Sequence, residues 1–266
     1  MQAATTAPVR LDIDGPVGRI TLDRPEAMNA VTLDLARQLG AAVRDAAATD
    51  GVRVLLIRGA GGNFCAGGDF DEVQRLRAEG ADALRRLFES FGGACAAIGE
   101  VEQPVVAAVE GVATAGGFEL MQACDVALVR DDARICDNHV NFGMVPGGGG
   151  SQRLPRLVGR QRALGHLLSG ERLSGVDAVA WGLAHRWFDA AAFDAGVDEF
   201  VARLAGRRPD AVAGIKRLVR GGLDVGLEEG LAHEVDAVVA HIAGEAGEAS
   251  MTSFAGRRAD AREGSR

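Results

Sequence analysis

One stretch decides the fold, Val109-Glu110-Gly111-Val112-Ala113-Thr114-Ala115-Gly116-Gly117-Phe118-Glu119-Leu120-Met121-Gln122-Ala123-Cys124-Asp125. Its pattern predicts an apolar strand, then a glycine pair, then a helix that begins at Gly116. Backbone amides at a helix start have no partner within the helix, so they can bind an oxygen that becomes negative. Glu119 follows one turn later as an acid or base. The segment therefore offers both halves of a site that activates a carbonyl group.

The sequence around this stretch alternates predicted strands and helices and then becomes helical only. The predicted strands are 9–13, paired as a hairpin with 18–22, then 52–58, 104–110, 125–130, 133–136 and 184–188. The predicted helices are 33–48 with Thr32 as its cap, 71–79, 82–99, one from Gly116, one after the turn 145–151, then 160–169, 175–182, and 191 to about 254 with breaks at Pro209 and Gly221. This order predicts an α/β core with a helical C-terminal region.

Composition narrows the class of protein. The chain has 266 residues, of which 47% are hydrophobic and 25% charged, as in an ordinary globular enzyme. Its net charge of −8 argues against binding to nucleic acid, which requires a basic face. With no apolar run of membrane-spanning length, no secretory leader and only four cysteines, the sequence predicts a cytoplasmic protein with reduced thiols that does not bind membranes.

Two glycine-rich turns each follow a predicted strand and precede a helix, at Gly61–Asp69 and Ala115–Gly117. Either turn alone is more often structural. Two such turns ahead of one glutamate predict a pair of backbone amides directed at one carbonyl oxygen, which would stabilise an enolate without a metal.

These segments resemble a known family. Three blocks look like the signatures of the enoyl-CoA hydratase/isomerase (crotonase) family: Phe64-Cys65-Ala66-Gly67-Gly68-Asp69, Ala115-Gly116-Gly117-Phe118-Glu119-Leu120 with Cys124-Asp125, and Gly143-Met144-Val145-Pro146-Gly147-Gly148-Gly149-Gly150-Ser151-Gln152-Arg153-Leu154-Pro155. Residues 24–30 are similar to its coenzyme A loop. The resemblance covers about residues 9–258, and several spaced blocks in order are specific for the family but not for one reaction within it.

The resemblance implies an α/β crotonase-like core of repeated β-β-α units with a C-terminal helical trimerisation region. It implies an acyl-CoA-binding catalytic core at 1–200, helices at 201–266 that pack in a homotrimer or hexamer, and no cofactor, since coenzyme A is part of the substrate. The amides of Ala66 and Gly116 would form the oxyanion hole. Substrate or coenzyme A contacts would come from Arg24, Ala27, Ala66, Gly67, Gly68, Asp69, Gly116, Phe254 and Arg258.

Glu119 matches the first catalytic carboxylate of family hydratases. Without the family blocks it would be read as an ordinary glutamate stabilised by the helix dipole. Beside an apolar acyl chain, its carboxyl group would lose solvent and its pKa would rise towards a range useful for proton transfer.

The second family carboxylate is replaced. His139 occupies its position, in Cys136-Asp137-Asn138-His139-Val140-Asn141-Phe142-Gly143. An imidazole can accept a proton from water and an imidazolium can give one to carbon, so we predict His139 as the second catalytic residue. The alternative is that it only fills space or binds a backbone carbonyl. Asp137 could orient His139 if both lay on one face of a strand.

Neighbouring residues suggest structural roles or exclude other chemistry. Asp69 is the expected cap of the following helix, and Cys65 a buried thiol without a base. The family lysine after this aspartate is absent, so phosphate contacts would fall to arginines such as Arg24, Arg75 or Arg77. Cys136 and His139 lack a second pair of metal ligands, and no P-loop, dinucleotide fingerprint or serine nucleophile elbow is present.

The predicted function is hydration of a 2-enoyl-CoA to a 3-hydroxyacyl-CoA by Glu119 and His139. A double-bond isomerase that uses Glu119 as its single base is the main alternative. A family member that binds acyl-CoA without turnover, and a helical scaffold that does not depend on the core glycines, are further alternatives.

Overall fold

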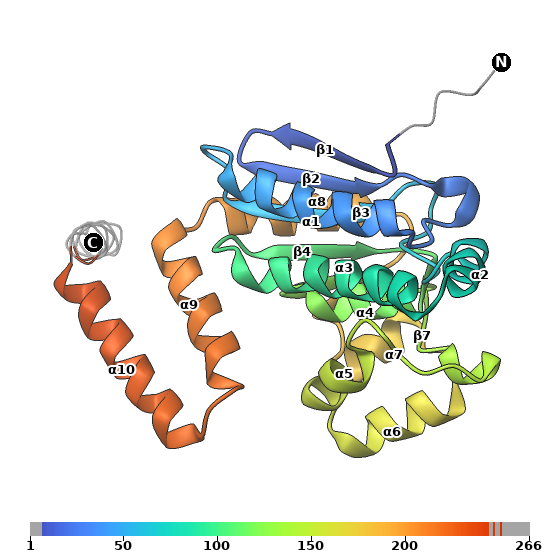
Figure 1. Ribbon diagram of the computed structural model, residues 1–266. Coiled ribbons are helices and arrows are strands. Elements are labelled where there is room, and N and C mark those ends of the chain that lie inside the picture. The colour runs from blue at the N-terminus through green and yellow to red at the C-terminus, as the bar shows by residue number, and fades with distance from the viewer. Residues whose placement is uncertain (1–6, 245–246, 248–250, 252–266) are drawn as a thin grey trace. The chain divides into compact units, whose positions relative to one another are not determined.

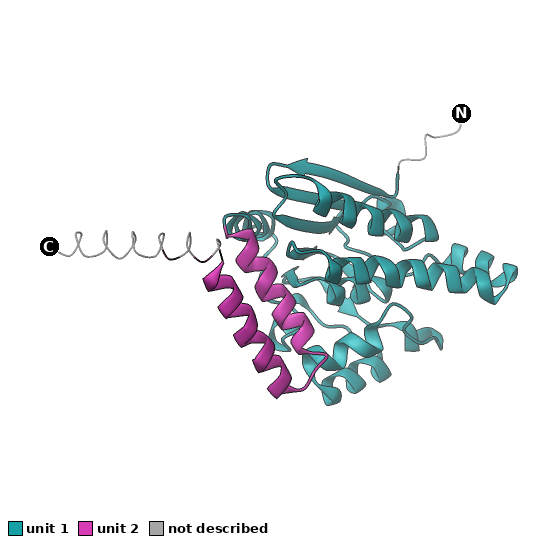
Figure 2. Cartoon of the chain, turned by 60° about the vertical axis from the view of Figure 1, so that its left-hand side comes forward, with its two compact units in different colours: residues 1–206 teal, residues 207–266 magenta. Residues whose placement is uncertain are grey.

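The computed structural model describes residues 7–244, 247 and 251. Contacts divide the chain into two compact units, residues 1–206 and 207–266, which Figure 2 colours teal and magenta. The predicted division at residue 200 lies inside helix α8 (Phe193–Ala205), whose Val201 and Ala205 are buried against the sheet. The sheet-containing unit therefore extends to Gly206.

A six-stranded sheet forms the centre of the first unit (Figure 1). Its order is β1 (Val9–Asp14), β2 (Val17–Leu22), β3 (Val54–Gly59), β4 (Val105–Val109), β6 (Val126–Arg130) and β8 (Arg186–Phe188). The hairpin β1–β2 is antiparallel, and every later pairing is parallel. A smaller parallel sheet joins β5 (Val112–Thr114) to β7 (Arg134–Cys136).

Helices cover both faces of the sheet because side chains alternate along each strand. Leu55 and Ile57 of β3 pack in the cluster that contains α1 (Leu33–Ala48) and α3 (Ala81–Glu100), which lie side by side in Figure 1. Val54 and Leu56 face the other way, into the cluster with α8. Both faces are therefore buried, as the apolar strands require.

The remaining elements are helices. They are η1 (Pro25–Ala27), α2 (Phe70–Glu79), α4 (Gly116–Ala123), η2 (His139–Phe142), α5 (Gly150–Val158), α6 (Arg160–Ser169) and α7 (Gly175–Ala180), while α9 (Pro209–Gly222) and α10 (Leu227–Ala243) belong to the second unit. β-β-α turns recur as β1–β2–α1, β4–β5–α4 and β6–β7–α5, which confirms the predicted architecture.

One short strand was not predicted. The strand expected at 104–110 ends at Val109, and the chain pairs again from Val112 in the smaller sheet. Gly111 makes the break: its φ is +59°, and a Cβ there would lie 2.1 Å from the carbonyl oxygen of Gly62. Only glycine fits such a close approach. The strand residues on both sides of Gly111 are mostly apolar, so the sequence pattern does not indicate that the chain passes from one sheet to the other.

Candidate active site

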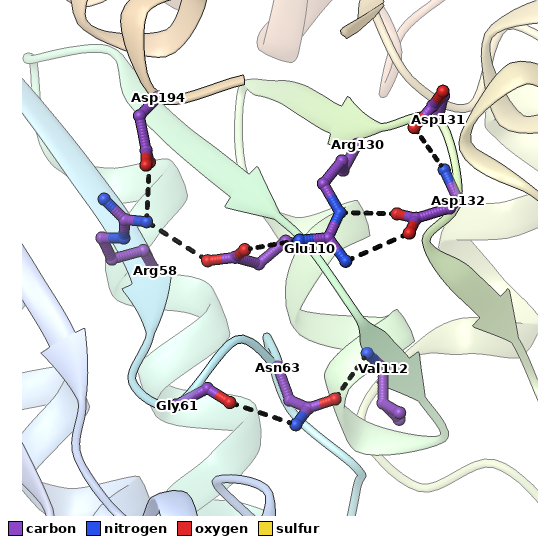
Figure 3. A network of polar contacts seen from close by, with 9 residues as sticks. All are labelled: Arg58, Gly61, Asn63, Glu110, Val112, Arg130, Asp131, Asp132 and Asp194. Atoms are coloured by element: carbon purple, nitrogen blue, oxygen red, sulfur yellow. Dashed lines mark hydrogen bonds and ion pairs between the residues drawn. The ribbon is translucent and has the colours of Figure 1, made fainter. Parts of the chain in front are cut away.

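Loops from separate strands meet at the carboxyl edge of the sheet, where open α/β sheets bind ligands. An ionic network ties the strand ends together there (Figure 3). Arg58 at the end of β3 pairs with Glu110 and with Asp194 of α8, and Arg130 at the end of β6 pairs with the other oxygen of Glu110. Glu110 directly follows β4 and lies two residues before β5, so the network fixes where the segment leading to α4 begins.

Two asparagines join the loops that the sequence analysis placed at the site. The buried side chain of Asn29 accepts from the Arg24 amide and donates to the carbonyl oxygens of Ala60 and Asn63. Asn63 in turn accepts from the Val112 amide through its Oδ1, as Figure 3 shows. These contacts connect the 24–30, 60–69 and 110–116 segments. Sequence reasoning did not assign either residue a role, because their partners are distant in the chain.

Arg24 and Asp69 come together as an ion pair. The Arg24 guanidinium donates to Asp69 Oδ2 at 2.9 Å and to the Ala30 carbonyl oxygen at 2.6 Å, and Asp69 Oδ1 accepts from the Glu72 amide. The predicted cap of α2 is confirmed. Arg24 thus already uses two of its N–H donors in bonds within the protein. Arg75 forms an ion pair with Glu79 on α2. Contacts of these arginines with coenzyme A therefore stay predictions.

The two glycine turns touch each other at the start of α4. A Cβ on Gly117 would lie 2.0 Å from the Cys65 carbonyl oxygen, and one on Gly67 would lie 3.1 Å from the Gly116 nitrogen. Ala115 takes a φ of +48°, a conformation that costs a non-glycine residue about 1–3 kcal/mol. This packing brings the 65–68 backbone beside the first turn of α4.

The amide of Ala66 is not a free donor. It donates to the Met28 carbonyl oxygen at 3.0 Å, so the prediction that it forms the oxyanion hole is wrong. Across the described part of the chain, the amides of Gly68 and Gly116 have no hydrogen-bond acceptor. The Gly67 amide contacts the Cys65 sulfur at 3.5 Å. The available pair is therefore Gly68 and Gly116.

Glu119 is buried and held by a turn 29 residues away. Its Oε1 accepts from the amides of Gly148 and Gly150, at 2.7 and 2.9 Å. Burial raises the pKa of Glu119, while the amides of Gly150 and Gly148 and the His139 ring act in the opposite direction. Oε2 has no hydrogen-bond partner within the described residues. The glycine run 147–150, predicted only as a turn, thus orients the acid.

His139 lies close enough to Glu119 for their charges to interact, with no direct hydrogen bond between them in the described structure. Its Nδ1 contacts Asp137 Oδ1 at 2.6 Å, which leaves Nε2 as the second ring nitrogen. Burial lowers the pKa of His139, but its hydrogen bond and charge interaction with Asp137, together with Glu119, outweigh burial and raise it.

The pairing of β5 with β7 explains why Glu119 and His139 lie close together. Thr114 is opposite Cys136, so the residues that follow each strand, Gly116 to Glu119 and Asp137 to His139, start next to each other. Asp137 contacts His139 at the start of the 3₁₀ helix η2 and not along a strand, because β7 ends at Cys136. On the other side, Phe88 and Phe91 of α3 lie within 3 Å of the Cβ positions of Gly147 and Gly148 and supply apolar surface.

The remaining predicted site residues are accounted for. Cys65 is buried with no solvent access, and burial raises its pKa to about 12, as expected for an inert thiol. Ala27 is half-buried in η1. Phe254 and Arg258 lie outside the described residues. Within those residues, no three metal-binding side chains are grouped, and no helix is long and apolar enough to cross a membrane.

Comparison with known proteins gives the family. The sequence model for enoyl-CoA hydratase/isomerase matches residues 12–263. The chain belongs to the enoyl-CoA hydratase/isomerase family. It is 32% identical over 251 residues to a probable enoyl-CoA hydratase of Rhizobium meliloti, covering 93% of this chain and 95% of that one.

Other family members carry different reaction names. A peroxisomal Delta(3,5)-Delta(2,4)-dienoyl-CoA isomerase of Arabidopsis thaliana is 30% identical over 233 residues, 84% of each chain. A solved structure of a putative enoyl-CoA hydratase from Thermobifida fusca in complex with CoA has a TM-score of 0.80 at 30% identity, over 89% of this chain and 93% of that one. The family is thus established, while the reaction must be argued from the site.

Proposed function

We propose that this family member binds an acyl-CoA thioester and hydrates a 2-enoyl-CoA to a 3-hydroxyacyl-CoA. The observation that carries the proposal is that Glu119 and His139 lie close enough for their charges to interact. A buried carboxylate has one free oxygen, and an imidazole held by Asp137 lies near it without a direct bond. Addition of water needs a base for the water and an acid for the carbon, and these two groups supply them.

In the proposed reaction the thioester oxygen accepts hydrogen bonds from the Gly116 and Gly68 amides. Glu119 takes a proton from water as the water oxygen bonds to C3, and the displaced electron pair moves onto the thioester oxygen as an enolate. When the enolate collapses, His139 Nε2 delivers a proton to C2. A proton returned through solvent from Glu119 to His139 restores the starting state.

A single-base isomerase is the second candidate. It is favoured by the dienoyl-CoA isomerase among the relatives and by the sufficiency of Glu119 alone for moving a proton along the acyl chain. In that reaction His139 would only shape the site. Both reactions use the same pair of backbone amides. They differ in whether oxygen or only hydrogen from the solvent enters the product, so this difference must be measured to distinguish them.

Isotope labelling tests the proposal. Crotonyl-CoA is incubated with the protein in oxygen-18 water, and a 3-enoyl-CoA in deuterium oxide, with mass spectrometry of the products. We expect oxygen-18 in the hydroxyl group of the crotonyl-CoA product. Deuterium incorporation with bond migration and no oxygen label would replace hydration by isomerisation. If both thioesters bind tightly but no label enters either product, the protein is an acyl-CoA binder without catalytic activity and the hydration proposal is wrong.

Assembly and location are proposed on the same basis. We expect a homotrimer or hexamer built through the second unit, and the predicted cytoplasmic location stays a prediction. The helices α9 and α10 expose large apolar side chains, which a second copy of the chain would cover. No nucleic-acid or membrane partner is proposed.

A further inference from the structure

The second-acid position contains two linked groups where the family pattern has one carboxylate. We propose that Asp137 is a positioning residue that holds His139 as a proton-donating imidazolium, so that Asp137 and His139 together replace the missing carboxylate. This inference rests on the proposed function, because it assigns the group that protonates C2. It adds a residue that the sequence analysis considered only as a possible orienting neighbour.

Geometry fixes the ring and its proton. Asp137 Oδ1 receives two hydrogen bonds from residue 139, from Nδ1 at 2.6 Å and from the backbone amide at 3.2 Å. A carboxylate oxygen only accepts, so Nδ1 carries a proton. Nε2 is then the nitrogen left for substrate. An aspartate two residues away thus fixes both the ring plane and the reactive nitrogen, as a carboxylate does in other histidine-dependent sites.

A second histidine, His166, contacts the backbone of Asp137. Asp137 is 1% exposed, and its backbone amide donates to Nε2 of His166 at 3.1 Å. His166 is also buried, and burial lowers its pKa, so it is a neutral acceptor with its proton on Nδ1. This hydrogen bond holds the backbone of Asp137 in place just before η2. His166 lies on α6, and its role could not be read from the chain.

Asp137 also faces the general base. A Cβ placed on Gly150 would lie 3.0 Å from Asp137 Oδ2 and 3.3 Å from Glu119 Oε1, so both carboxyl groups border the same point. Oδ2 is buried with no hydrogen-bond partner in the described structure. Two neighbouring carboxylates favour a cation between or beside them. His139 is the group placed to carry that charge.

The groups that influence His139 come from several elements. Asp137 before η2 and Glu119 of α4 act on its ring directly. Behind Asp137, His166 of α6 accepts from the Asp137 amide, Glu171 acts on His166, and Arg172 acts on Cys136. Asp137 makes the hydrogen bond to the ring and has the stronger effect of the two carboxylates that raise its pKa. Removing the Asp137 charge should therefore lower the pKa of His139.

The test uses the full-length protein with Asp137→Asn. An asparagine keeps an oxygen that accepts from Nδ1 but has no charge, so it separates electrostatics from shape. The pH dependence of kcat/KM for crotonyl-CoA hydration is measured with wild type, Asp137→Asn and Asp177→Asn. Asp177 belongs to the capping box of α7, so its variant controls for loss of a structural aspartate.

We expect the high-pH limb of kcat/KM to move to lower pH in Asp137→Asn only. Above neutral pH its kcat/KM should fall by about tenfold or more, with the 10²–10⁴-fold that a positioned acid contributes as the upper limit. A limb that stays in place with Asp137→Asn would overturn the proposal and leave Asp137 a structural residue.

A second measurement keeps the inference separate from the proposed function. The His139 imidazole is titrated by NMR without substrate, with His139→Gln to assign its signal. A titration midpoint that falls in Asp137→Asn supports the dyad even if no thioester is hydrated, in which case only the function fails. An unchanged midpoint overturns the dyad even if hydration proceeds.

Discussion

Glu119 combines a function with a cost in stability. Burial raises the pKa of its carboxyl group although two amides favour the charged form. A raised carboxyl pKa contributes stability that is fully present below the pKa of the unfolded state, about 4.3, and lost as pH rises through the folded-state pKa. Ionising this buried carboxyl group therefore costs stability, and the ionised form is the one that the proposed mechanism uses as the base. Sites that trade stability for activity behave in this way.

Gly150 leaves little space for a side chain between two carboxyl groups. A Cβ would lie 3.0 Å from Asp137 Oδ2 and 3.2 Å from Glu119 Cγ. We expect Gly150→Ala to displace Glu119, lower kcat, and cost about 1–3 kcal/mol of unfolding free energy through overpacking. Steady-state kinetics and denaturant unfolding measure the two effects.

Gly165→Ala is the matched control. Gly165 lies exposed in helix α6, and a Cβ there would meet no atom within 4 Å. We expect this variant to keep its activity and to gain about 0.5–1 kcal/mol, because alanine is the better helix residue. Equal activity and stability of Gly150→Ala and wild type would contradict the crowding described above.

At the scale of elements, periodicity predicted most of the core. The hairpin, the helix capped by Thr32 and the helix from Gly116 are confirmed, because each has local signals in strand alternation, a capping hydroxyl or a glycine pair. The break at Gly111 was missed, since it depends on close approach to Gly62, 49 residues earlier.

The functional groups divide in the same way. The candidate side chains Glu119 and His139 have distinctive chemistry, so the sequence could suggest them, and the structure places them close to each other. The backbone amides of the proposed oxyanion hole could not be assigned correctly from the sequence. Whether the amide of Ala66 or of Gly68 is free depends on the carbonyl of Met28 in another loop. The clamp on Glu119 by Gly148 and Gly150 is likewise a tertiary contact.

At the scale of the whole molecule, the described helices of the second unit expose large apolar side chains. Within the described residues α10 has no buried side chain, and its exposed apolar residues recur at helical spacing: Leu227, Leu231, Val235, Val238, Val239 and Ile242. Exposed apolar patches of this kind mark protein interfaces. We expect light scattering to give three or six times the monomer mass.

A matched pair of variants tests that assembly. Val235→Glu places a charge on the apolar face of α10 and should reduce the mass, whereas Glu228→Lys at the exposed start of the same helix should not. A monomer in the wild-type protein at micromolar concentration would contradict the proposed homotrimer or hexamer.

The rate of crotonyl-CoA hydration by Glu119→Gln tests the central claim most directly. Glutamine keeps an Oε1 that can accept from Gly148 and Gly150, so the fold and thioester binding should be retained, with stability at neutral pH at least that of wild type. We predict a loss of kcat of about 10²–10⁴-fold, the contribution of a general base. Hydration at the wild-type rate by the folded variant would contradict the assignment of Glu119 as the base.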